Sequence, residues 1–233
     1  RSAALSDFFE DVFEMRLAAY AYRVRGGDVA KGHVLSNAEE LATFERDAPR
    51  LFEGAAEADL AAIARLGEGS RAYREAFEAS VEATERRDLA VAEAESAVVA
   101  ARAALGRLLA AAAERDAGEA AAAIGATVER LLAGQVLVER HLLRPSAEAA
   151  ERATAALAEA EVATSELLGV VNGAGLAGIA FESIQAVRGS KAAFTALIEA
   201  ASAREAFFVD RMDVIGPELE MIADVLVMDQ RRQ

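Results

Sequence analysis

Residues 171–181 read VNGAGLAGIAF, and Gly173, Gly175 and Gly178 are spaced as G-x-G-x-x-G. That spacing is typical of a dinucleotide-binding turn, which needs a β-strand before it and a helix after it. The preceding residues 153–171, ATAALAEAEVATSELLGVV, have the composition and period of a helix. Because no alternating strand pattern occurs anywhere in the chain, we expect a turn between two helices, an all-α fold and no cofactor.

The composition is that of long helices. Of 233 residues, 54% are hydrophobic, many of them alanine, and only 6% are aromatic. The formal net charge of −14 argues against nucleic acid as a partner, and the absence of cysteine excludes thiolate chemistry and cysteine-based metal sites. No apolar run approaches the roughly 20 residues that a helix needs to cross a bilayer. Since the chain begins with Arg1, we read it as a segment of a longer protein.

Hydrophobic spacing predicts six helices, four short and two long. Their expected ranges are about 5–25, 28–52, 59–113, 118–142, 146–171 and 176 to nearly the end. Turn residues separate them, notably Gly26 and Gly27, Gly54, and Pro145 followed by Ser146, which predicts a helix cap. The stretch GEGS at 67–70 is a soft spot inside the third helix. The first helix has a heptad seam formed by Leu5, Phe8, Val12, Met15, Ala19 and Tyr22.

The order short, short, long occurs twice, which indicates an internal duplication. YREAFEASVEATERRD at 73–88 matches SKAAFTALIEAASARE at 190–205. At about 1.5 Å per residue, a long helix of roughly 80 Å equals two short ones of roughly 35–40 Å laid end to end. This arithmetic predicts two stacked four-helix bundles with both chain ends at one pole. One bundle would contain residues 1–26, 84–143 and 202–233, and the other residues 28–83 and 146–201.

The whole chain resembles the helical bimodular sensor domain of bacterial methyl-accepting chemotaxis receptors and sensor histidine kinases. The stretches that carry the resemblance are EMRLAAYAYRVRGGD at 14–28, LVERHLLRPSAE at 137–148, and YREAF and SKAAF at the openings of the matched long-helix segments. The resemblance implies a periplasmic module, anchored in the inner membrane, that binds small organic acids within its bundles. It also implies that cations and a tyrosine from the first, fourth and sixth helices hold the ligand, with bundle 1–26, 84–143, 202–233 nearer the membrane.

Polar residues on or beside the apolar seams are the candidate ligand-binding residues, because unpaired buried polar groups cost free energy. Counted from the shared pole, Arg16, Tyr20, Gln135 and Arg211 fall at one height. Arg140 and Arg204 complete this first predicted site. Guanidinium groups beside a hydroxyl and an amide suit a small carboxylate. The alternative is that these arginines pair with neighbouring acidic residues on the surface.

A second anion site is predicted in the other bundle. Its residues are Tyr73, Arg74, Arg188 and Lys191, which lie near the long helices. The alternative here is a solvated charged face.

Catalytic and metal sites are not expected. The two histidines, His33 and His141, do not lie in Glu-x-x-His, so the chain lacks the ligands of a di-iron bundle. No strained nucleophile turn is visible either. We therefore expect a sensor domain that is no enzyme and forms a parallel homodimer through its first or fourth helix. Two alternatives remain: a sensor that recognises a periplasmic binding protein, and a structural helical adaptor with no small ligand.

Overall fold

The computed structural model describes residues 2–54, 56–172 and 175–232, and these are helical almost throughout, with no strand among them. Gly173, the first glycine of the triplet, lies outside the described residues. The helices are α1 (Ser2–Arg25), α2 (Asp28–Leu51), α3 (Glu57–Glu114), α4 (Gly118–Leu143), α5 (Ala147–Val171), α6 (Ala177–Ala206), the π-helix η2 (Phe207–Met212) and α7 (Asp213–Arg232). The all-α prediction is confirmed.

The helix ends agree with the turn signals in the sequence. Gly26 and Gly27, between α1 and α2, have φ of 66° and 97°, a region that favours glycine. Ser146 caps α5, because its Oγ accepts a hydrogen bond from the backbone N–H of Ala149 at 3.1 Å. Of the described glycines with the G-x-G-x-x-G spacing, Gly175 has a φ of 67° in the connection between α5 and α6, and Gly178 lies in the first turn of α6, so the element before them is a helix and not a strand.

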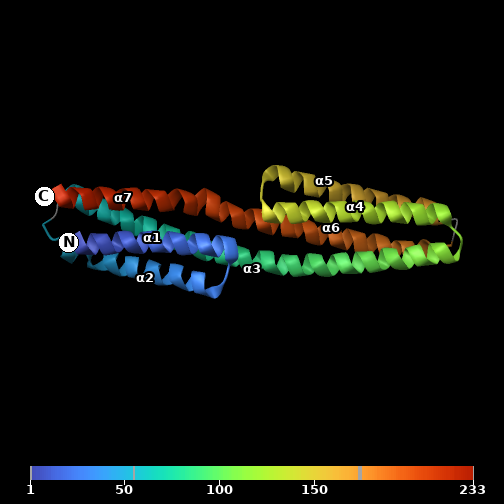
Figure 1. Ribbon diagram of the computed structural model, residues 1–233, viewed down its shortest axis with the longest axis horizontal. Helices are drawn as coiled ribbons and strands as arrows, with labels where there is room; N and C mark the ends of the chain where they lie inside the picture. The colour runs from blue at the N-terminus through green and yellow to red at the C-terminus, as the bar shows by residue number, and fades with distance from the viewer. Residues whose placement is uncertain (1, 55, 173–174, 233) are drawn as a thin grey trace. The chain divides into compact units, whose positions relative to one another are not determined.

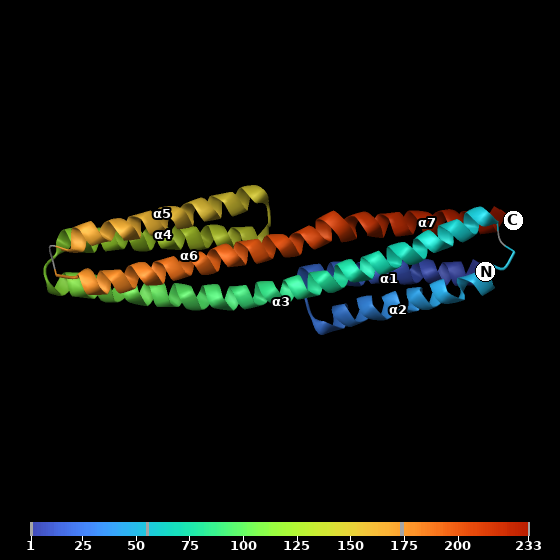
Figure 2. The same cartoon turned by 180° about the vertical axis from the view of Figure 1, so that it is seen from behind.

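The chain divides into two compact units. Unit 1 contains residues 1–82 and 206–233, and unit 2 contains residues 83–205. In unit 1, α1 and α2 lie side by side as a hairpin, beside the first part of α3 and α7; in unit 2, α4 and α5 form the corresponding hairpin (Figures 1 and 2). The start of α1 and the end of α7 lie at the same end of unit 1 (Figure 1).

The predicted partition of the helices is wrong. Residues 1–26 were expected to share a bundle with 84–143, and 28–83 with 146–201, whereas α1 shares its unit with α2, and α4 with α5. The reason is the length of the connections: two residues join α1 to α2 and three join α4 to α5. Connections this short reverse the chain, so the joined helices become antiparallel neighbours and cannot continue end to end.

The core of unit 1 is built around large side chains. The whole predicted seam of α1, from Leu5 to Tyr22, is buried in it. The ring centroids of Phe8 and Phe44 are 4.6 Å apart, and those of Tyr22 and Phe77 are 5.2 Å apart with the rings edge to face. Aromatic pairs at such distances add to the burial of their own surface.

The predicted soft spot at 67–70 is instead a place of close packing. α3 runs through it without a break. A Cβ on Gly69 would stand 2.6 Å from Leu219 Cδ2, so the missing side chain lets α7 approach α3 there. The glycines therefore serve contact between helices of unit 1.

Two of the described helices, α3 and α4, contain a stretch that is long and apolar enough to cross a membrane by length and composition alone. The expectation that no apolar run approaches that length was therefore too strong. Alanine makes the difference, because it counts as apolar but is small. Core helices of bundles pass the same test, and this finding by itself assigns no span.

Candidate functional site

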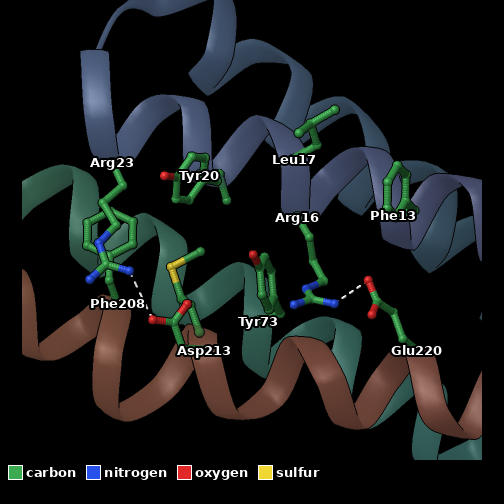
Figure 3. A pocket seen from close by; sticks show the side chains of 11 residues that line it. Phe13, Arg16, Leu17, Tyr20, Arg23, Tyr73, Phe208, Asp213 and Glu220 are labelled. Atoms are coloured by element: carbon green, nitrogen blue, oxygen red, sulfur yellow. Dashed lines mark hydrogen bonds and ion pairs between the residues drawn. The ribbon is translucent and has the colours of Figure 1, made fainter.

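A pocket lies in unit 1 where α1 faces η2 and α7, and we call it the α1–α7 pocket (Figure 3). Its volume is about 350 Å³, within the range of small-molecule sites. Its lining is Phe13, Arg16, Leu17, Ala19, Tyr20, Arg23, Tyr73, Phe208, Met212, Asp213 and Glu220. The residues come from three separate stretches of sequence, which only the folded unit brings together.

Heptad spacing places the charged residues of the pocket. Arg16 and Arg23 are seven residues apart on α1 and follow the buried Met15 and Tyr22, so both lie at the edge of the core seam. Asp213 and Glu220 are also seven apart, on α7, whose end lies beside the start of α1 (Figure 1). Equal spacing on two antiparallel helices matches each arginine to one carboxylate.

Both of these ion pairs are present in the structure. The guanidinium of Arg16 is ion-paired with the carboxylate of Glu220. Arg23 Nη1 donates to Asp213 Oδ2 at 2.9 Å, and its guanidinium also lies 5.4 Å from the centre of the Phe208 ring. The two ion pairs stand on either side of Tyr73 (Figure 3). The pocket thus contains two positive and two negative groups.

Tyr73 reaches the pocket from α3 and is only 3% exposed. Burial raises the pKa of its hydroxyl well above its usual range; Arg16 opposes this shift, while Asp213 and Glu220 add to it. The hydroxyl is therefore neutral at physiological pH, and it can both donate and accept a hydrogen bond.

The absence of a side chain at Gly216 makes room for the side chain of Arg16. A Cβ on Gly216 would lie 2.5 Å from Arg16 Nε, so the arginine side chain passes directly over this glycine of α7. The neighbouring Pro217 has no N–H, so the carbonyl of Asp213 loses its usual i+4 donor. Just before this point the backbone widens into η2, which carries Phe208 and Met212 into the pocket. Short π-helical insertions of this kind occur frequently at functional sites.

The structure brings together only part of the first predicted site. Arg16 and Tyr20 both line the pocket. Arg211 does not line it: the side chain is exposed and its guanidinium lies 5.9 Å from the centre of the Phe207 ring. Arg211 belongs to η2, a π-helical turn whose buried residues are Phe208 and Met212. Sequence periodicity does not reveal that turn.

The other three predicted residues belong to unit 2. Gln135 donates to Glu139 at 3.0 Å and lines a separate, mostly apolar groove in that unit. Arg204 is buried and donates from Nε to Thr84 Oγ1 at 3.0 Å, and Arg140 is exposed on α4. The prediction that these three residues meet Arg16 is wrong, because they belong to unit 2 and α1 belongs to unit 1.

The second predicted site is divided in the same way. Tyr73 and Arg74 belong to unit 1, and Arg188 and Lys191 to unit 2. Arg74 pairs with Glu78 at 2.9 Å. The Glu161 carboxylate forms ion pairs with Lys191 Nζ at 2.6 Å and with Arg188 Nε at 3.3 Å. These cations lower the pKa of Glu161, Lys191 most strongly. The alternative given for these cations, a solvated charged face, describes them better, and the ion pairs with Glu78 and Glu161 are part of that face.

Sequence reasoning missed Arg23, Asp213 and Glu220, and assigned Tyr73 to the wrong site. A signal was present, since the interval of seven residues occurs in both charged pairs. It could be read only with the knowledge that α1 and α7 are neighbours.

Among the described residues, no group of three or more acidic or histidine side chains is placed to hold a metal ion. Comparison of the sequence with protein-family models and with curated proteins finds no match.

Proposed function

We propose that this chain is the ligand-binding domain of a membrane-anchored bacterial chemoreceptor, a periplasmic module that takes a small organic acid into the α1–α7 pocket. One observation carries the proposal: two guanidinium groups and a buried, neutral tyrosine hydroxyl face one cavity of suitable volume. Guanidinium groups recognise carboxylates by charge and by paired hydrogen bonds. The overall resemblance of the sequence to helical sensor domains points in the same direction.

Signalling requires that the ligand bind one helix arrangement more tightly than another. The pocket lies between α1 and α7, and the outer ends of these two helices lie at the same end of unit 1 (Figure 1). A ligand that draws Arg16 or Arg23 away from its α7 partner would change how α7 packs on α1. A shift of about 1–2 Å along a helix is the usual size of such a transition.

Isothermal titration calorimetry tests the proposal. The chain is titrated with a panel of mono-, di- and tricarboxylates and amino acids, and thermal unfolding is followed in parallel. A bound ligand at a hundred times its Kd stabilises the protein by about 2.7 kcal/mol. We expect Arg16→Ala to abolish both signals, because it removes the guanidinium that lies beside Tyr73 in the pocket (Figure 3).

Arg211→Ala is the matched control, because Arg211 is an arginine of η2 that does not line the pocket. Its binding should equal that of the unaltered chain. Binding that survives Arg16→Ala, or a panel in which nothing binds, contradicts the proposal.

A second copy of the chain is the protein partner that we propose. Phe13, Leu17, Tyr20 and Val24 follow one another along α1 and each is more than half exposed; the first three also line the α1–α7 pocket, so the stripe runs along the rim of that pocket. The spacing of four, three and four residues makes them a continuous helical stripe, as in a coiled-coil interface. Pairing of two such stripes would remove this apolar surface from water.

Sedimentation velocity tests this pairing. We expect concentration-dependent dimers that Val24→Glu dissociates, since Val24 belongs to the stripe and does not line the pocket, and that Val162→Glu, at a similarly exposed site on α5, leaves intact. A chain that remains monomeric at all concentrations favours the alternatives, in which the stripe of α1 meets a periplasmic binding protein or belongs to a structural adaptor.

A further inference from the structure

The α1–α7 pocket is balanced in charge. Arg16 and Arg23 supply two positive groups, and Asp213 and Glu220 supply two negative groups, already paired across the helices. Seven residues correspond to about 10 Å along a helix, so the pairs form two separate rungs. Any charged ligand must therefore enter a site whose charges have partners.

A simple anion fits this arrangement poorly. To reach Arg16 it must displace the Glu220 carboxylate, whose side chain is 31% exposed. Glu220 would then have lost its cation and would lie beside the negative charge of the ligand. Two like charges in a partly dehydrated site repel each other and oppose binding. A simple cation meets the converse difficulty, because pairing with Glu220 leaves Arg16 without a partner.

The two rungs differ in how easily they open. The Asp213 side chain is 59% exposed and can turn into water, whereas Glu220 is about half as exposed. Arg23 is additionally held over the Phe208 ring. Because Glu220 is less able than Asp213 to turn into water, a ligand that enters at the pair of Arg16 and Glu220, beside Tyr73, must supply partners for both of these charges.

We propose that the pocket binds a zwitterion, an α-amino acid or a close analogue, inserted into the rung of Arg16 and Glu220. The ligand carboxylate accepts from the Arg16 guanidinium and the Tyr73 hydroxyl, and the ligand ammonium donates to the Glu220 carboxylate. Each protein charge exchanges one partner for another, so none is left unpaired. This inference rests on the proposed function and specifies its ligand class.

The rest of the lining selects among amino acids. Phe13, Leu17, Tyr20 and Met212 surround the polar groups with apolar surface. An apolar ligand side chain gains from burial there, about 0.8 kcal/mol per methylene removed from water. A charged ligand side chain would disturb the balance of the two rungs. The lining therefore favours amino acids with apolar side chains.

Calorimetry on the intact chain tests the inference with defined probes. The panel contains the proteinogenic amino acids, succinate, and two analogues of leucine: 4-methylpentanoate, which lacks the ammonium group, and 3-methylbutylamine, which lacks the carboxylate. We expect binding by one or more apolar amino acids. Leucine should bind at least about tenfold more tightly than either analogue, because each analogue leaves one protein charge unpaired.

Glu220→Gln gives the decisive comparison. It should weaken amino-acid binding by about tenfold or more and strengthen the binding of 4-methylpentanoate and succinate, because it removes their competitor for Arg16. Glu218→Gln, an exposed acid on the same helix that does not line the pocket, changes the net charge equally and should alter neither. Circular dichroism on both variants confirms that they fold.

The outcomes separate the two proposals. If carboxylates bind, amino acids do not, and Glu220→Gln improves carboxylate binding, the zwitterion is excluded while the organic-acid sensor stands. If no amino acid and no carboxylate binds, both proposals fail. Equal affinity for leucine and 4-methylpentanoate, unchanged by Glu220→Gln, also overturns the inference.

Discussion

Unit 1 and unit 2 have the same plan, a helical hairpin beside parts of the long helical segments, but they fill their cores differently. Unit 1 has all three tyrosines of the chain and every phenylalanine except Phe181 and Phe194. Alanine makes up a larger share of the buried apolar residues in unit 2, as at Ala94, Ala101 and Ala153, than it does in unit 1. Small side chains let helices approach closely, whereas large ones hold them apart. The cavity with the charged lining is in the unit with large side chains.

The largest expected effect is the loss of an aromatic side chain from unit 1. Phe77 is fully buried against Tyr22. Phe77→Ala should lower the free energy of unfolding by about 3–5 kcal/mol, because it removes buried surface and leaves a cavity. Urea denaturation followed by circular dichroism measures the change. A cost below about 1 kcal/mol would mean that unit 1 does not depend on its aromatic core.

The converse change in unit 2 should also destabilise, by less. Ala153 is fully buried where α5 packs in its unit. Ala153→Leu should cost about 1–3 kcal/mol, because a closely packed seam has no room for a larger side chain. Ala155→Leu, at an exposed position on the same helix, is the control and should be nearly neutral. A stabilising effect at Ala153 would show that unit 2 has unfilled space.

The hairpins differ at the starts of their second helices. Ser146 caps α5 with its side chain, whereas the cap position of α2 is Gly27, which supplies no side-chain hydrogen bond. Ser146→Ala should cost about 1 kcal/mol, because the Ala149 N–H loses its acceptor. Thermal unfolding measures it. An unchanged melting temperature would mean that the cap of α5 contributes no more than the glycine of α2.

The smallest expected effect is a difference in pH response. In unit 1, burial raises the pKa of Asp11 to about 6, and the nearby Glu40 carboxylate adds to the shift. A raised folded-state pKa stabilises the fold below the ordinary value of 3.8, and that contribution is lost as the pH rises through about 6. Glu161 in unit 2 has a lowered pKa, so its contribution is present above 4.5 and is lost as the pH falls.

Asp11→Asn isolates this difference. The variant should lose the decline in stability between pH 4 and 7 that Asp11 causes, and it should be the more stable protein at pH 8. Urea titrations across this range measure the change, with Glu10→Gln, at an exposed position on the same helix, as the control. A parallel pH dependence in the Asp11 variant and the unaltered chain would contradict the assignment.

The helices and their seams could be predicted from the sequence because their signals are local. Glycine, proline and serine mark the ends of α1 and α5, and the interval of three and four residues identifies the buried face of α1 from Leu5 to Tyr22. The pairing of helices is a property of the folded chain. The lengths of the helices suggested stacking end to end, but the connection of two residues at Gly26 and Gly27 forces a hairpin.

The pocket was predicted only as far as α1. Arg16 and Tyr20 follow from the seam of one helix. The partners Asp213 and Glu220 lie roughly two hundred residues away, and their selection depends on the antiparallel packing of α7 on α1. Arg211 was misassigned because it lies in a π-helical turn, where Phe208 and Met212 are buried and Arg211 is exposed, and such a turn has no periodic signal in the sequence.

The widened turn at 207–212 and Pro217 together weaken the backbone ladder along one wall of the pocket. An interrupted ladder has fewer hydrogen bonds to break when it opens locally, so amide protons exchange there sooner than in α1 across the pocket. A ligand clamped between the two helices would slow that exchange first on the α7 side. On the proposed function, the more loosely bonded wall would be the one that moves on ligand binding, and α1 would be the helix against which it moves.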